Sequence, residues 1–71
     1  MNIQDFAVKY QRRFGTNIEF GMAKKTGPDH RPVVTVEVFT NFGTFEGSGS
    51  NKKVARANAV GAAAASPDYP F

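Results

Sequence analysis

The stretch from residue 33 to residue 40 constrains the fold of this chain more than any other. It is rich in valine and threonine, and β-branched residues of this kind favour extended structure. Side chains alternate between the two faces of a strand, so Val34, Val36 and Val38 share one face. We therefore predict a strand whose all-valine face is buried, with the other elements arranged around it.

A second strand is predicted before this one, over residues 17–24. Its apolar side chains alternate, which places Ile18, Phe20 and Met22 together on the expected core face. Gly21 interrupts the pattern, and a glycine inside a strand either weakens the strand or marks a bulge.

A third strand is predicted over residues 44–48, with Phe45 pointing inward. The residues before it, 41–43, end in a glycine and have the composition of a hairpin turn. The central strand and the third strand therefore form an antiparallel pair.

A helix is predicted at each end of the chain. Over residues 2–14, apolar residues recur at helical spacing and form one stripe: Ile3, Phe6, Ala7, Tyr10 and Phe14. Asn2 can cap the start of this helix, and Gly15 is placed to end it. The other helix runs from about Asn51 to Ala65, and its small-residue face can lie close to a sheet: Ala55, Ala59, Ala62 and Ala63.

Together these elements predict an α+β domain of two layers. The order is helix, three antiparallel strands, helix (α-β-β-β-α), with both helices packed on the apolar face of the sheet. We assign residues 1–66 to this domain and residues 67–71 to a C-terminal tail, which frays unless its two aromatic residues dock onto the body.

Composition excludes several classes of function. The chain has 71 residues, no cysteine and one histidine, so a disulfide or a structural zinc site is not expected, nor is a cofactor. No apolar run approaches the roughly 20 residues of a membrane span. The start lacks the features of a secretory signal, so we expect a cytoplasmic or nuclear location. The net charge of +3 is weak support for a polyanionic partner.

The start of the last helix carries the strongest functional signal. A Gly/Ser-rich stretch over residues 47–50 leads into Asn51, a good helix cap, and then into Lys52, Lys53 and Arg56. Cations at the positive end of a helix dipole cost roughly a few tenths of a kcal/mol each. Their presence here predicts a bound anion, held by free backbone amides and by the side-chain cations.

Three segments, in this order and on these elements, resemble a double-stranded RNA-binding domain over roughly residues 2–65. They are residues 3–6 of the first helix, residues 27–30 of the loop between the first two strands, and residues 51–56. The resemblance implies the same α-β-β-β-α fold. It also implies binding of double-stranded RNA by shape, across two minor grooves and the major-groove phosphates between them, with little sequence preference.

The resemblance also assigns the contact residues. Gln4 and Asp5 of the first helix would reach one minor groove, although Asp5 can instead serve as a helix-capping carboxylate. The loop residues Pro28, Asp29 and His30 would reach the other groove, and for His30 the alternative is an ordinary surface histidine. The basic cluster, which would bind the phosphates, consists of Lys52, Lys53 and Arg56, with arginine standing where lysine is usual.

Two other functions remain open at this point. Some relatives with this fold dock proteins or dimerise, and Phe39 with Phe42 at the end of the hairpin would form an interaction patch for a partner or a second copy. The alternative is that the two rings simply pack against each other. The sequence shows no nucleophile–base pair or metal cluster, so we expect no catalysis by this segment. It can still be one module of a larger RNA-processing or RNA-regulatory protein.

Overall fold

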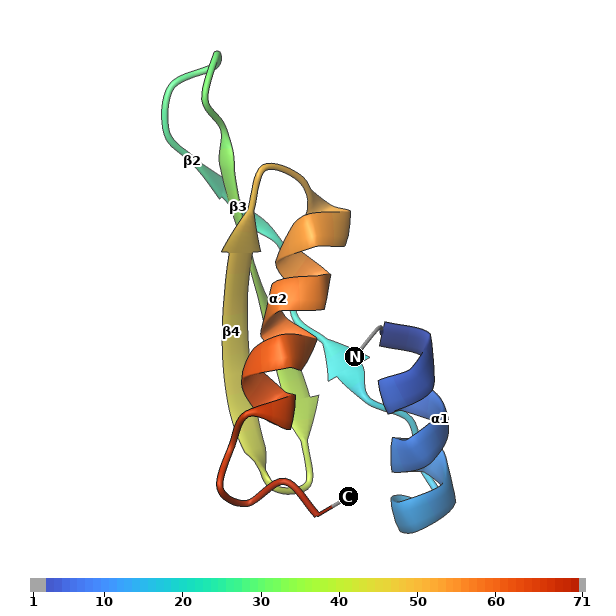
Figure 1. Ribbon diagram of the computed structural model, residues 1–71. Coiled ribbons are helices and arrows are strands. Elements are labelled where there is room, and N and C mark those ends of the chain that lie inside the picture. Colours follow the sequence, from blue (N-terminus) through green and yellow to red (C-terminus); the bar gives the residue numbers. More distant parts are fainter. Residues whose placement is uncertain (1–2, 71) are drawn as a thin grey trace.

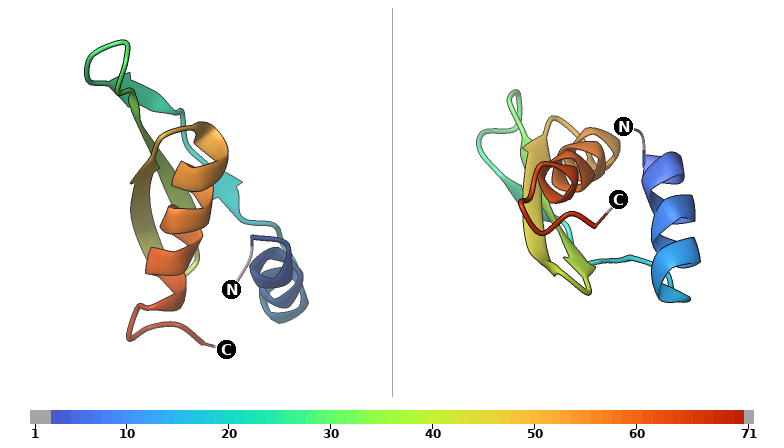
Figure 2. Two further views of the ribbon diagram at one scale, coloured as in Figure 1. Left: turned by 45° about the horizontal axis from the view of Figure 1, so that its top comes forward. Right: turned by 60° about the horizontal axis from the view of Figure 1, so that its bottom comes forward.

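The computed structural model describes residues 3–70, and its two layers are visible in Figure 1. The elements follow the predicted order: α1 (Ile3–Phe14), β1 (Glu19–Phe20), β2 (Lys24–Thr26), β3 (Val33–Thr40), β4 (Gly43–Gly49) and α2 (Lys52–Ala64). Figure 2 shows α2 lying against the sheet and α1 standing beside α2. The predicted α-β-β-β-α architecture is confirmed.

The strand predicted over residues 17–24 is only partly confirmed, because two short strands, β1 and β2, pair with one edge of β3 in its place. Most of β2 lies beyond residue 24, in the segment that was predicted as loop. Phe20 of β1 lies opposite Val38, and Lys24 of β2 lies opposite Thr35, both in antiparallel register. Between these pairs, three residues on one strand (21–23) face only two on β3. One residue is therefore extra, which is the definition of a β-bulge. The other edge of β3 is occupied by β4.

The bulge changes which side chains point inward. Gly21 still donates its N–H to the carbonyl of Glu37 at 2.8 Å, but the alternation is lost after it. Met22 is 85% exposed, whereas Ala23 packs beside Val36 in the core. The prediction that Met22 faces the core is therefore wrong, because the extra residue moves the following side chains to the other face. The bulge at Gly21 was one of the two predicted meanings of this glycine.

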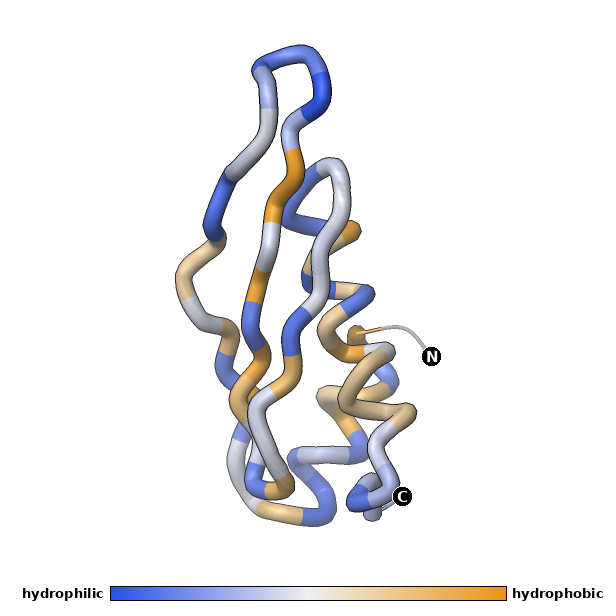
Figure 3. The backbone as a smooth tube through the Cα atoms, turned by 90° about the vertical axis from the view of Figure 1, so that its left-hand side faces the viewer, coloured by the Kyte–Doolittle hydropathy of each residue, from blue (hydrophilic) through white to orange (hydrophobic). Residues whose placement is uncertain are grey.

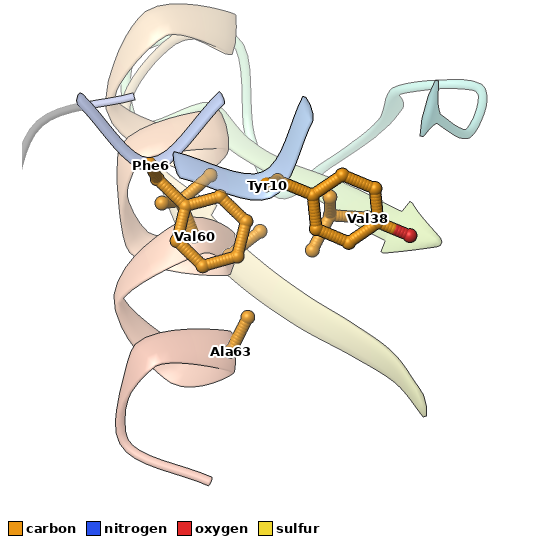
Figure 4. Close-up of a cluster of buried hydrophobic side chains, with 6 residues drawn as sticks. Phe6, Tyr10, Val38, Val60 and Ala63 are labelled. Atoms are coloured by element: carbon orange, nitrogen blue, oxygen red, sulfur yellow. The ribbon is translucent and has the colours of Figure 1, made fainter. Parts of the chain in front are cut away.

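The core is built where both helices meet β3. Val34, Val36 and Val38 are buried, as the alternation predicted. Figure 4 shows Phe6 and Tyr10 of α1 meeting residues from α2 and β3 in one cluster. A second, smaller cluster lies under the start of α2 and contains Val34, Val36 and Ala55.

Helix α2 approaches β4 so closely that their backbones touch at Gly47. A side-chain carbon at Gly47 would lie 2.6 Å from the carbonyl oxygen of Ala55 and would overlap the amide nitrogen of Ala59. Ala55, Ala59 and Ala63 are fully buried on this side of the helix, and Ala62 is half-buried. The predicted small-residue face therefore makes the close contact with the sheet that it was expected to make.

Helix α1 is fixed at its C-terminal end and by one long-range bond. Gly15 has φ +73° and donates its N–H to the carbonyl of Gln11 at 2.8 Å, which ends the helix as predicted. The Tyr10 hydroxyl accepts the N–H of Asn41 at 2.7 Å, so α1 is tied to the turn between β3 and β4. The proposed cap Asn2 lies outside the described residues.

The C-terminal segment returns to the body. Tyr69 stacks on Phe6 with ring centroids 6.1 Å apart, so one of the two tail aromatics docks; Phe71 lies outside the described residues. The boundary of the domain at residue 66 stays a prediction.

Candidate nucleic-acid interface

The three predicted contact regions are spread along the length of the molecule, which measures 40 × 20 × 19 Å. In Figure 1 the loop between β2 and β3 forms one end, the start of α2 lies next, and α1 lies toward the other end. Every predicted contact residue is exposed: Gln4, Asp5, Pro28, Asp29, His30, Lys52, Lys53 and Arg56. The fold therefore separates the three regions and leaves all of their predicted contact side chains accessible.

The start of α2 has the geometry of a capped helix. Asn51 is extended (φ −153°, ψ 173°), and its side-chain oxygen accepts the N–H of Val54 at 3.0 Å. Helix α2 begins at the next residue, Lys52, and has no acidic residue in its first turn. The predicted N-cap at Asn51 is confirmed, and the positive end of the helix dipole is left for an anion.

The three cations of α2 are available for an external anion. Lys52 and Arg56 lie four positions apart and therefore on one side of the helix, with Lys53 beside them. Within residues 3–70, no carboxylate forms an ion pair with any of the three. Arg56 has a different kind of partner, because its guanidinium carbon lies 5.3 Å from the centre of the Phe20 ring. This contact joins α2 to β1.

The loop between β2 and β3 projects beyond the rest of the domain. Figure 3 shows that its tip is hydrophilic. Gly27 enters the loop with φ +86°, a conformation that favours glycine, and a side-chain carbon there would lie 2.8 Å from the carbonyl oxygen of Arg31. The N–H of Arg31 bonds the carbonyl of Pro28 at 2.9 Å and closes a turn that contains Asp29 and His30.

The surroundings of the loop histidine bear on whether it could bind a metal ion. Residues 3–70 contain no group of three histidine, cysteine, aspartate or glutamate side chains that could hold a metal ion. His30 is instead an exposed donor and acceptor at the end of a polar projection.

The first turn of α1 presents the remaining predicted contacts. Gln4 and Asp5 are exposed, while the next residue, Phe6, turns into the core. Asp5 lies in the first turn, where a carboxylate suits the helix dipole. A helix-stabilising role and a binding role are therefore both compatible with its position.

The outer face of the sheet carries the opposite charge. Residues 37 and 39 alternate with the buried valines of β3, so they point away from the helices. Glu37 pairs with Glu46 and Phe39 pairs with Glu19, which places three carboxylates on this face. Two carboxylates directly opposite one another repel, and a phosphate backbone is repelled by both. Lys24, opposite Thr35, lies on the same face nearer the loop, so the carboxylates gather around Glu37 and Phe39.

The structure does not bring Phe39 and Phe42 together. Phe39 is 41% exposed on the outer face, where its ring lies against Gly21. Phe42 turns inward and joins the aromatic cluster, with ring centroids 6.5 Å from Phe6 and 6.4 Å from Tyr10. The predicted shared patch does not form, because strand alternation points Phe39 to the outer face while Phe42, in the turn, packs against the core cluster.

Sequence patterns did not indicate the contact between Phe20 and Arg56. Phe20 was correctly assigned to the core side of its strand, and Arg56 was assigned to the basic cluster. The contact depends on how α2 is placed over β1. Such a placement cannot be predicted from the spacing of residues within one element or from composition.

No helix in residues 3–70 has both the length and the apolar character needed to cross a membrane. Comparison with curated proteins gives no match. The family model of the double-stranded RNA binding motif matches residues 3–63, which span α1, the sheet and all but the last residue of α2. Domains of this family bind double-stranded RNA and are not themselves catalytic. With its helix order, its capped basic helix and this match over most of its length, the chain belongs to the double-stranded RNA binding motif family.

Proposed function

We propose that this domain recognises A-form RNA duplexes by their shape and without reading a defined sequence. The observation that carries the proposal is the capped start of α2, where three cations without acidic partners in the described chain surround the positive end of a helix. An RNA phosphate backbone supplies the anion that this arrangement lacks.

In this proposal the start of α2 binds phosphates across the major groove. Lys52 and Arg56 lie on one side of the helix with Lys53 beside them, so they can reach neighbouring phosphates. Each neutralised phosphate releases counterions, and three such contacts give a slope of log affinity against log salt of roughly −3, taking the rule for B-form DNA as a guide.

The α1 start and the β2–β3 loop supply the contacts that select RNA. They lie on either side of the α2 start along the molecule, an order that suits two successive minor grooves with the major groove between them. Minor grooves of RNA display 2′-hydroxyl groups, which can donate to the Asp5 carboxylate and exchange hydrogen bonds with Gln4 or His30. DNA has no such hydroxyl, so these contacts favour RNA.

The carboxylates on the outer face of the sheet are a reason to expect that RNA binds to the other side of the domain. Glu19, Glu37 and Glu46 lie away from the helices and repel phosphates. A duplex therefore meets the domain on the side that carries the cations.

The test is a titration with RNA and DNA duplexes of matched sequence, each longer than the roughly 16 base pairs that such a domain spans. We expect binding to RNA that weakens with salt, and clearly weaker binding to DNA. Equal affinity for both duplexes would reject shape recognition of RNA and leave only a general attraction to polyanions. Sedimentation without RNA completes the test, because a concentration-dependent dimer would favour the protein-interaction function instead.

A further inference from the structure

We propose that Phe20 is a positioning residue for Arg56, which holds the arginine ready for a phosphate before RNA arrives. This inference rests on the proposed function, because it concerns how one of the three α2 cations is presented. Its basis is the guanidinium carbon of Arg56, 5.3 Å from the centre of the Phe20 ring. That distance lies within the range of a cation–π contact.

The Phe20 ring is well suited to be a fixed platform. Its residue pairs with Val38 in the sheet, so its backbone is set by the register of β1. The half-buried side chain packs against both hydrophobic clusters, the one around Phe6 and Tyr10 and the smaller one under the start of α2. These contacts with two clusters limit the motion of the Phe20 ring. A ring held in this way also limits the positions that the Arg56 guanidinium can take.

An arginine can use this platform and bind a phosphate simultaneously. The flat face of a guanidinium stacks on aromatic rings, while its N–H groups point outward along its edges toward phosphate oxygens. A flexible side chain loses conformational freedom when it binds, and a contact already present in the free protein reduces that loss. The contact thereby improves binding without touching RNA.

The two lysines of the same cluster differ in this respect. In the part of the chain that the structure describes, no aromatic ring lies under Lys52 or Lys53. Their ammonium groups end long, flexible chains and act as mobile point charges. The cluster thus combines one positioned cation with two mobile ones, and only the positioned one depends on β1.

The experiment is a double-mutant cycle for affinity to an RNA duplex, with Phe20→Leu, Arg56→Gln and the double variant. Phe20→Leu removes the ring but keeps an apolar side chain. We expect roughly a threefold loss of affinity, because an Arg56 side chain that is not held in the free protein loses more conformational freedom on binding. In the Arg56→Gln background the same substitution should have no effect. Fully additive losses would overturn the inference, because the two residues would then act separately.

Phe20→Tyr is the conservative control, since it retains the ring and should retain wild-type affinity. A loss as large as that of Phe20→Leu would count against the ring as a platform. If Phe20→Leu does not fold, Arg56→Lys takes its place: it keeps the charge, loses the flat stacking group, and should also weaken binding roughly threefold. Unchanged affinity of a folded Arg56→Lys variant would overturn the inference.

Nuclear magnetic resonance of the free protein gives a readout that is independent of RNA. The side-chain protons of Arg56 should be shifted by the ring current of Phe20, and the shift should disappear in Phe20→Leu while the remaining spectrum stays that of a folded protein. Unshifted Arg56 protons in the wild type would contradict the contact.

The two proposals fail in different ways. A wild-type domain that does not bind RNA rejects the proposed function, whereas a wild-type domain that binds RNA but gives an additive cycle rejects only the role of Phe20.

Discussion

The start of α2 and the loop between β2 and β3 are equally exposed, yet they are supported in very different ways. The α2 start is capped by Asn51, packs its first turn against Gly49 of β4, and sets Arg56 over Phe20. The loop depends on a glycine with positive φ, on the hydrogen bond from Arg31 to Pro28 within it, and on a long one from the Thr26 hydroxyl to Val33 at its base. Under the proposed function, the anchored α2 start would supply electrostatic affinity, and the projecting loop would supply the selectivity for RNA.

The largest effect is expected where the anchoring itself is broken, in Gly47→Ala. The added methyl group would overlap the backbone of α2, so helix and strand must separate. We expect the free energy of unfolding to fall by about 3 kcal/mol, the upper part of the usual range for overpacking. Chemical denaturation monitored by circular dichroism measures this change.

The matched control is Gly61→Ala. It is also a glycine-to-alanine change, but Gly61, unlike Gly47, is not packed against another described element. Within residues 3–70, a side-chain carbon at Gly61 meets no atom within 4 Å beyond its chain neighbours and the backbone of its own helix, α2. Alanine should therefore stabilise the helix by roughly 1 kcal/mol. Similar effects of the two substitutions would contradict the close approach of α2 to β4.

The next largest effect is expected for Lys53→Ala, which tests whether the α2 start contributes to RNA affinity. Lys53→Ala should weaken RNA binding roughly tenfold and make the salt slope less steep by nearly one unit, because one phosphate contact is lost. The unfolding free energy should hardly change, since Lys53 is exposed. Binding titrations at several salt concentrations give both quantities.

Lys9→Ala is the control for charge alone. Lys9 is exposed on α1 and lies outside the predicted contacts. Its removal should reduce affinity much less than Lys53→Ala does. If both variants lost the same affinity and slope, net charge rather than the α2 start would account for binding.

The smallest effect is expected in the loop, with His30→Ala. RNA affinity should fall severalfold while DNA affinity stays constant, because the lost contact is the one assigned to the minor groove. Parallel titrations with the two duplexes measure the ratio. Arg31→Ala is the companion variant, and it should weaken RNA and DNA binding alike because it removes a charge. An unchanged RNA-to-DNA ratio in His30→Ala would remove this histidine from the interface.

Sequence patterns predicted the fold well where one strand or helix determines its own burial. The alternation in β3 identified Val34, Val36 and Val38 as core residues, because β4 pairs with that strand in unbroken register from Val34 to Thr40. The same reasoning failed at Met22, because a bulge is a property of a strand pair and its exact position is not visible in one strand.

In the candidate site, too, sequence patterns predicted features within one element but not contacts between elements. The cap and the cations of α2 follow from adjacent residues, so the sequence was sufficient for them. The contact of Arg56 with Phe20 and the separation of Phe39 from Phe42 depend on packing between distant segments. Those features required the structure.

The close approach at Gly47 also has a consequence for the order of folding. It joins β4 to α2, and β4 is in turn paired with β3, so residues 33–64 form a packed unit from one continuous piece of chain. Short loops close at low entropic cost, which favours early formation of this unit. Helix α1 must find its place across a longer chain separation. We expect mutations in the β4–α2 contact to slow folding, and mutations of buried α1 residues such as Phe6→Leu mainly to speed unfolding, which stopped-flow kinetics can distinguish.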